Sequence, residues 1–293
     1  MYTPPEESGT VSSGSRIASL TVDKATPAAP EAPSSASETG ETRVVLASVS
    51  GNSDYGTIQY GYTTGGETEV PEDRWQISTD FDGLQPGTDY TFYSRYSGND
   101  FYTASAKSTQ GLQVTTLPQI TTSGLVDGTV GVRYSQTLSA NSGKTVTWII
   151  SGGALPAGLN LNGNTIDGTP TVTADSQSVT IQATISDAGG TSVSSQKVLT
   201  ITIGKGTPTD PEEGTGYTID YEEETVTARA GYELSAANSA DAEGNDTLSV
   251  TPGTDVYVRL KGTQTYHPSN WVTVDIPDRP AAPNLFIETQ AEG

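Results

Sequence analysis

The sequence predicts an all-β protein, organised as a linear array of small β-sandwich domains. Thr (45) and Ser (31) together make up 76 of the 293 residues, whereas Asp, Glu, Lys and Arg make up only 17%. Such a composition favours strands and turns over charged, solvated helices. The 32 Gly and 17 Pro supply frequent turn residues, and one Met with four Phe leaves little from which to build a helical core.

The charge and the missing residue types exclude several classes of function. Lys and Arg number 14 against 35 Asp and Glu, a net charge of −21, which repels nucleic acid and anionic membranes. With no Cys and one His, the chain lacks the residues for thiol catalysis, cysteine-ligated zinc or a multi-histidine metal site. No run approaches the roughly 18 consecutive apolar residues of a membrane span. We therefore expect no enzyme activity, no cofactor, no nucleic-acid partner and no membrane insertion.

An internal repeat sets the number of modules. Residues 93–105 align without a gap on residues 257–269, and Pro-Gly-Thr-Asp occurs shortly upstream of both segments. Two related modules therefore flank a different one. We expect domains at residues 28–117, 118–205 and 206–284, with residues 1–27 as a linker or the tail of a preceding module and residues 285–293 as a C-terminal tail.

The first module, residues 28–117, shows strand patterns and a corner motif. Strands are expected at residues 43–49, 57–63, 89–96 and 111–116, and residues 89–96 alternate between two faces of a sheet. Leu84-x-Pro86-Gly-Thr-x-Tyr90 has the form of a corner in which the tyrosine hydroxyl bonds to nearby backbone. In these residues the module resembles a fibronectin type III domain. The resemblance implies a β-sandwich in which Leu84, Pro86 and Tyr90 have structural roles.

Aromatic residues crowd into the first module and have two interpretations. Tyr60, Tyr62, Tyr93 and Tyr102 combine a flat apolar ring with a polar tip, which suits the binding of sugars or proteins. Such side chains also pack across the strands of a β-sandwich. Trp75 is likewise expected either in the core or as an exposed platform for sugars. The sequence leaves these interpretations open.

The second module, residues 118–205, carries a more specific combination of motifs. It contains Gly-Thr-Val-Gly-x-x-Tyr134, Leu-Pro-x-Gly158-Leu and Ile-x-Gly168-Thr-Pro. Val179, Ile181 and their neighbours alternate with polar residues, which indicates a half-buried strand, and the glycines are placed where turns need unusual backbone angles. The module resembles the immunoglobulin-like, cadherin-like domains of bacterial surface proteins.

The third module, residues 206–284, is expected to be a β-sandwich related to the first. Residues 218–228 predict a hairpin with an acidic turn, and further strands are expected near residues 232–235, 247–250, 255–261 and 271–276. Val256 stands where the first module has Tyr90, so the corner hydrogen bond is absent. Repeats that end in Arg-Pro-Ala-Ala-Pro resemble those in large surface proteins of gut Firmicutes.

These resemblances imply a non-enzymatic stalk or adhesive segment of a Gram-positive bacterial cell-surface protein. The alternative is an accessory region, for spacing or carbohydrate targeting, of an extracellular glycoside hydrolase. The partner would be a host or neighbouring-cell surface protein or a glycan, and the segment is expected to be a monomer in isolation. Residues 1–7 do not read as a secretory signal. We expect an extracellular location, on the bacterial surface or secreted, with signal and anchor outside this chain.

Clustered carboxylates near the second junction raise the question of calcium. Asp210, Glu212, Glu213 and Asp220 follow the second module closely, and calcium binds six to eight oxygens. The functional interpretation is an interdomain calcium site. The alternative is a solvated acidic linker and hairpin turn, which the absence of an Asp-x-Asp-x-Asp-Gly type of loop favours.

Calcium titration distinguishes the two interpretations. If the carboxylates are only solvated charge, millimolar calcium leaves the melting temperature of the second and third modules unchanged, because an ion stabilises only a fold that binds it. Differential scanning calorimetry measures this, with magnesium as the control. A saturable rise specific to calcium would establish the site instead.

Overall fold

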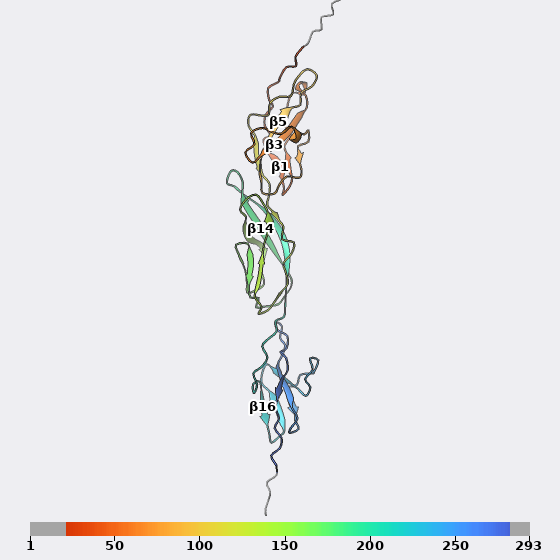
Figure 1. Ribbon diagram of the computed structural model, residues 1–293, viewed down its shortest axis with the longest axis vertical. Helices are drawn as coiled ribbons and strands as arrows, with labels where there is room; N and C mark the ends of the chain where they lie inside the picture. Colours follow the sequence, from red (N-terminus) through yellow and green to blue (C-terminus); the bar gives the residue numbers. More distant parts are fainter. Residues whose placement is uncertain (1–21, 282–293) are drawn as a thin grey trace, which may run out of the picture. The chain divides into compact units, whose positions relative to one another are not determined.

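The computed structural model describes residues 22–281, and almost every regular element in this range is a β-strand (Figure 1). The exceptions are two single-turn 3-10 helices, Ser53–Tyr55 and Glu72–Arg74. The predicted all-β class is confirmed. Most of the expected N-terminal tail and all of the expected C-terminal tail, residues 285–293, lie outside the described residues.

The described chain divides into two compact units. Unit 1 consists of residues 22–39, 43–83 and 89–114, and unit 2 of residues 40–42, 84–88 and 115–281. Within unit 2, two separate hydrophobic clusters mark what we call the second and third modules.

Unit 1 contains two three-stranded sheets, ordered β1–β2–β4 and β3–β5–β6. The predicted alternation along residues 89–96 is confirmed, because Tyr90, Phe92 and Ser94 are buried while the residues between them are partly exposed. The strands are β1 (Ala36–Thr39), β2 (Val44–Leu46), β3 (Ile58–Thr64), β4 (Asp80–Phe81), β5 (Asp89–Tyr96) and β6 (Leu112–Thr115).

The three residues to which the corner motif assigns structural roles are buried. Leu84 and Tyr90 are each 4% exposed, and Pro86 is buried as well. The Tyr90 ring lies edge-on to Tyr62, with ring centroids 5.2 Å apart. Burial of these residues is what a structural corner requires, and the backbone partner of the Tyr90 hydroxyl stays a prediction.

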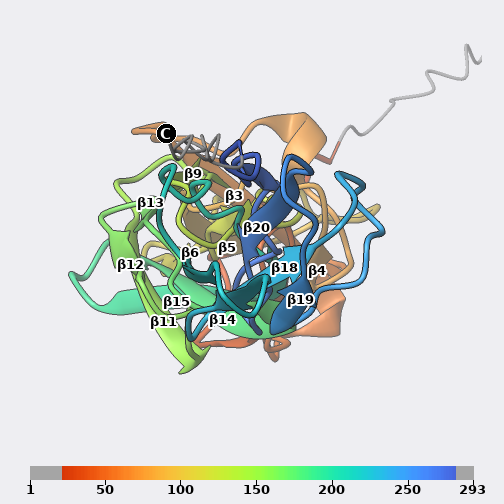
Figure 2. The same cartoon turned by 90° about the horizontal axis from the view of Figure 1, so that it is seen from below.

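The second module is a sandwich whose main sheets are ordered β11–β14–β15–β8 and β12–β13–β9. Figure 2 labels strands of both sheets, among them β14 and β13. The long β14 and β15 form an antiparallel hairpin, and β15 pairs in parallel with β8. The strands are β7 (Gln119–Ile120), β8 (Gly128–Thr129), β9 (Tyr134–Thr137), β10 (Ala140–Asn141), β11 (Thr147–Gly153), β12 (Leu159–Asn162), β13 (Thr165–Gly168), β14 (Ala174–Ser186) and β15 (Ser192–Gly204).

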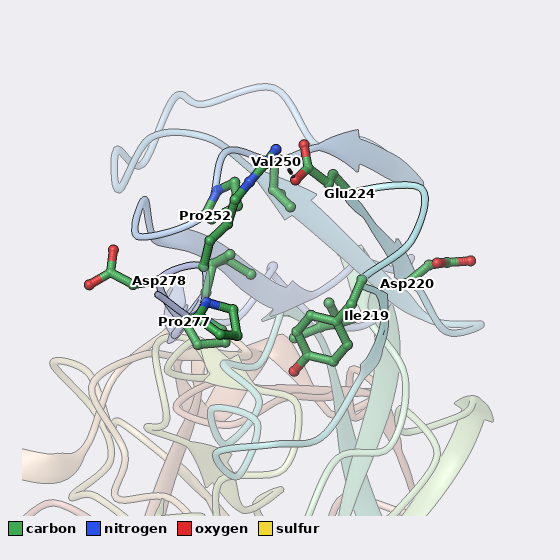
Figure 3. A pocket seen from close by; sticks show the side chains of 11 residues that line it. Ile219, Asp220, Glu224, Val250, Pro252, Pro277 and Asp278 are labelled. Carbon is green, nitrogen blue, oxygen red and sulfur yellow. Dashed lines mark hydrogen bonds and ion pairs between the residues drawn. The ribbon is translucent and has the colours of Figure 1, made fainter. Parts of the chain in front are cut away.

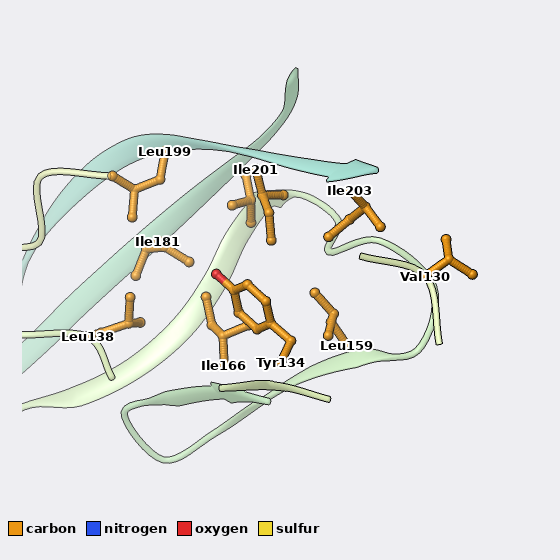
Figure 4. Packing of buried hydrophobic residues seen from close by; sticks show 10 residues of the cluster. Val130, Tyr134, Leu138, Leu159, Ile166, Ile181, Leu199, Ile201 and Ile203 are labelled. Atoms are coloured by element: carbon orange, nitrogen blue, oxygen red, sulfur yellow. The ribbon is translucent and has the colours of Figure 1, made fainter. Parts of the chain in front are cut away.

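The core of the second module lies between these sheets (Figure 4). Val179, Ile181, Ala183 and Ile185 are at most 3% exposed, which confirms the alternation predicted for this strand. Tyr134 closes the cluster, and its hydroxyl donates a hydrogen bond to Gln136 Oε1 at 2.9 Å. Burial, with a smaller contribution from the charge of Asp127, raises the pKa of Tyr134 to about 12.

Two glycines allow two backbone segments of the second module to approach each other closely. Gly158 and Gly168 have φ angles of +92° and +135°, in the region where side chains cause strain. A Cβ on either residue would collide with the opposing backbone, at the carbonyl of Thr169 or of Gly158 itself. The turn role that the sequence predicts for both glycines is confirmed.

The third module repeats the strand order of unit 1. Its sheets are β16–β17–β19 and β18–β20–β21, the same order in six successive strands. The expected strands and the hairpin with an acidic turn are confirmed. The bounds are β16 (Tyr217–Asp220), β17 (Thr225–Ala228), β18 (Tyr232–Ser235), β19 (Thr247–Ser249), β20 (Val256–Leu260) and β21 (Val272–Val274).

The hydrogen bonds of the repeat correct the position assigned to Val256. Ser105 accepts the Tyr96 N–H through its hydroxyl, and Ser269 accepts the Leu260 N–H in the same way, both at 2.9 Å. If Tyr96 and Leu260 are equivalent, Val256 is equivalent to Phe92 and not to Tyr90. The third module has two residues fewer between Pro-Gly-Thr-Asp and this strand, which accounts for the difference.

Comparing two glycines tests whether this close backbone approach contributes to the stability of the second module. Gly163→Ala, at φ +60° with no atom within 4 Å of the new Cβ, should cost about 1 kcal/mol of unfolding free energy, the usual penalty for a left-handed residue. Gly158→Ala adds a backbone collision and should cost about 3 kcal/mol or more. Urea denaturation with hydrogen exchange of β12 and β13 measures both. Equal costs would show that the close approach of the backbone is unimportant.

Candidate functional site

The structure does not bring together the four tyrosines that the sequence suggests as a binding face. Tyr60 is 3% exposed, and its hydroxyl accepts the Val49 N–H at 2.8 Å. Tyr62 packs edge-on to Phe81, with centroids 5.7 Å apart. Both rings therefore take part in cross-strand packing inside unit 1.

The other two tyrosines of this set lie elsewhere. Tyr93 pairs with Gly61 in the sheet and lies on the opposite face from Tyr62, with Lys107 Nζ 4.9 Å from its ring centroid. Tyr102 lies in the loop after β5, edge-on to Tyr55 at 5.0 Å. Alternation along β5 is visible in the sequence and sets Tyr93 opposite Tyr90 and Phe92. Its separation from Tyr60 and Tyr62 follows from the register of β5 with β3, which the sequence does not show.

Trp75 occupies neither of its two expected positions. It is half-buried, and it packs over Gly61, where a Cβ would collide with the indole ring. The guanidinium of Arg95 lies 4.4 Å from the indole centroid and donates two hydrogen bonds to Glu72 at 2.7 and 2.8 Å. The hydrogen bond from Arg95 holds the pKa of the Glu72 carboxyl below its ordinary value.

The third module contains a second stack of the same composition. Arg259, which aligns with Arg95, lies 4.0 Å from the centroid of Trp271 and donates to Glu233 Oε1 at 2.6 Å. The two tryptophans differ in their place in the sequence, because Trp75 precedes its arginine and Trp271 follows its own. The repeat alignment therefore identifies the arginines but not their partners, which is why sequence reasoning missed both stacks.

The two stacks differ in how exposed their carboxylate is, and replacing the arginine in each tests whether that difference sets its contribution to stability. Arg259→Met leaves Glu233, whose side chain is 16% exposed, without its partner and should lower the unfolding free energy by about 2 kcal/mol. Arg95→Met leaves Glu72, which is 80% exposed, without its partner and should lower the unfolding free energy by less than about 1 kcal/mol. Chemical denaturation of the full chain measures both. The reverse order would refute the assigned role of carboxylate burial.

The calcium candidates are dispersed over different interactions. Asp210 accepts hydrogen bonds from the backbone and side chain of Asn270 at 2.8 and 3.0 Å, and Asp220 accepts the N–H groups of Glu222 and Glu223 at 3.0 Å. The carbonyl of Glu212 accepts a hydrogen bond from the Thr215 hydroxyl. Burial, with a smaller contribution from the charge of Glu213, raises the pKa of Tyr217. Residues 22–281 hold no group of three or more acidic, His or Cys side chains arranged for a metal.

A cavity of about 370 Å³ lies in the third module, between the β16–β17 turn and the segment after β21 (Figure 3). Its walls are apolar, with Val250, Pro252 and Pro277 among them, and its rim carries charges. Arg279 forms an ion pair with Glu224, whereas the carboxylates of Asp220 and Asp278 point away from the cavity (Figure 3). This lining suits an apolar group.

No catalytic domain is identified in the part of the chain that the structure describes. His267, the single histidine, lies in an exposed turn, and its backbone N–H donates to Gly206 O. No helix among residues 22–281 is long and apolar enough to cross a membrane.

Comparison with known proteins places one module in a family. Residues 113–204 match the family model described as "Putative Ig domain". The second module is thus immunoglobulin-like, a kind of domain typical of extracellular proteins. The match covers less than a third of the chain, and no curated protein matches the sequence.

The solved structures similar to this chain are arrays of comparable domains. The FN1–FN3 domains of chicken CNTN1 are 15% identical, with 87% of this chain and 100% of that one covered and a TM-score of 0.28. Human CDH23 EC21–23 is 14% identical, with coverages of 86% and 99% and a TM-score of 0.33. At these scores the similarity carries no conclusion about function.

Proposed function

We propose that this chain is a non-enzymatic stalk or adhesive segment of a bacterial cell-surface protein. The observation that carries the proposal is the succession of separate small sandwiches, each with its own sheets and, in unit 2, its own hydrophobic cluster. Small modules of this kind join in tandem without sharing a core, which suits a spacer. The cysteine-free composition and the acidic charge agree with such a location.

The alternative proposal is an accessory region of an extracellular glycoside hydrolase. The same modules would then space or target a catalytic domain that lies outside this chain. The sequence that flanks the segment distinguishes the two, because a wall-anchoring signal supports the stalk and a catalytic domain supports the accessory region.

An adhesive role would need a recognition surface, and the cavity of the third module is the strongest candidate. The Tyr221 side chain lines it and is 67% exposed, so a ligand can reach its ring. A host or neighbouring-cell surface protein or a glycan would be the partner. Without such binding, the segment acts as a spacer only.

A glycan array and a cell-binding assay on the full chain test the proposal. A stalk binds neither, whereas an adhesive segment shows saturable binding that Tyr221→Ala weakens about tenfold by removing an aromatic contact. Val132→Ala, which shortens an equally accessible side chain (57% exposed), serves as the control. Hydrolysis of any glycan by the purified chain would contradict the non-enzymatic assignment.

A further inference from the structure

The loop that carries Tyr102 in unit 1 is rebuilt around Tyr266 in the third module. The N–H of Asn99 donates to the Tyr102 carbonyl, and the N–H of Thr263 donates to the Tyr266 carbonyl, each at 2.9 Å. The side-chain oxygens of Asn99 and Thr263 accept the N–H groups of the two residues that end each loop. Different side chains thus stabilise one backbone conformation.

The chain that enters each module pairs with this loop in the same way. Ala25 forms a parallel bridge with Tyr102, and Gly206 forms one with Tyr266. In both cases two main-chain hydrogen bonds of 2.9 to 3.2 Å join the entering residue to the loop. The preceding lysine also binds the loop, because Lys24 Nζ and Lys205 Nζ each donate to its first carbonyl, at 2.7 and 2.6 Å.

Tyr266 is more than a loop residue, because its ring joins the third module to the second. The ring packs against the hydrophobic cluster of the second module, which contains Val130. Its hydroxyl lies close to Gly131, 3.2 Å from where a Cβ would stand. Val130 is itself held by a hydrogen bond of 3.0 Å from its N–H to the carbonyl of Gly204, at the end of β15. Tyr266 therefore caps the end of an immunoglobulin-like module.

At the corresponding place in unit 1, Tyr102 is partly buried against Tyr55, but two apolar side chains of the described residues beside it are exposed. Phe101 is 77% exposed. Val22 is 78% exposed, although it stands three residues before Ala25, the place that Ile203 takes before Gly206. Ile203 is 2% exposed in the core of the second module.

The sequence around this surface matches the end of the second module. Residues 17–27 align without a gap on residues 198–208, with Lys24-x-Thr-Pro and Lys205-x-Thr-Pro in register. Two residues depart from this match at the joint, because Asp23 stands where the second module has Gly204, and Ala25 where it has Gly206. A Cβ on Gly206 would collide with the carbonyl of Val130 and with the ring of Tyr266. With Ala25 at this place, both the partner's carbonyl and the ring of Tyr102 must therefore stand slightly farther away.

We propose that Phe101 and Tyr102 form a docking surface for the end of an immunoglobulin-like module of the same kind as residues 118–205, in which Val22 would take the place of Ile203. The module would lead into Lys24 as the second module leads into Lys205, and Tyr102 would cap it as Tyr266 caps the second module. This interaction goes beyond the proposed function, and it holds equally for a stalk, an adhesive segment or an accessory region.

An extended chain tests the proposal directly. Residues 1–22 are replaced by a second copy of residues 118–203, so that the copy of Ile203 leads into Asp23. The amides of Ala25 and Thr103, which carry the joint hydrogen bonds, should then exchange about tenfold more slowly than in the original chain. Tyr102→Ala in the extended chain should abolish that gain, while it changes exchange little in the original chain.

The existing joint provides the control. In the original chain, Tyr266→Ala should accelerate exchange of the Gly206 and His267 amides by a similar factor. Unchanged exchange there would overturn the proposal even if the added copy failed to fold. A folded added copy without slower exchange at Ala25 would overturn it as well. Protection at Ala25 that rises with concentration of the original chain would identify a second molecule as the occupant, and would also refute the tandem assignment.

Discussion

Each module of this chain depends on burying one side of short strands, because none has a disulfide or a metal cluster within the described residues to hold it together. A small domain buries a smaller share of its surface than a large one does. Small sandwiches therefore need every inward position. The second module meets this demand with β14 and β15, whose inward residues from Val179 to Ile185 and from Leu199 to Ile203 are nearly inaccessible. A polar substitution at any of these positions would leave an unsatisfied group in the core.

Hydroxyl side chains perform the second task, which is to satisfy backbone groups where strands end. Ser105 and Ser269 accept the N–H of a strand residue in equivalent loops, and Thr116 accepts the N–H of Thr88 at 3.0 Å. Tyr60 and Tyr96 do the same for the backbone at Val49 and Asn52. Ser, Thr and Tyr residues of this chain are thus used to satisfy the backbone. At these positions a side-chain hydroxyl accepts the backbone hydrogen bond that a neighbouring strand would accept in a longer sheet.

The features that the sequence predicts are those written in local patterns. The alternation of residues 89–96, the long strand at Val179 and the turn glycines Gly158 and Gly168 follow from the spacing of residues alone. The failures have a common cause, since they depend on which distant segments meet. Nothing near Arg259 in the sequence shows that Glu233 lies across the sheet from it, and the tyrosines of the first module were separated by the register of β3 and β5. The clustering of tyrosines in the sequence suggested one face, but the sheet places their side chains on opposite faces.

The parallel pairing of β8 with β15 has a mechanical consequence. The chain passes through the short β7 and then β8 as it enters the second module, and it leaves through β15. Ile203 of β15 pairs with Gly128 of β8. The hydrogen bonds of a parallel pair are evenly spaced and cross between the strands at a slant. Tension that pulls these two strands in opposite directions would load their bonds together in shear rather than open them one at a time. Resistance to such a force is set by the rate of unfolding and not by its equilibrium. A module of modest thermodynamic stability can therefore still bear load.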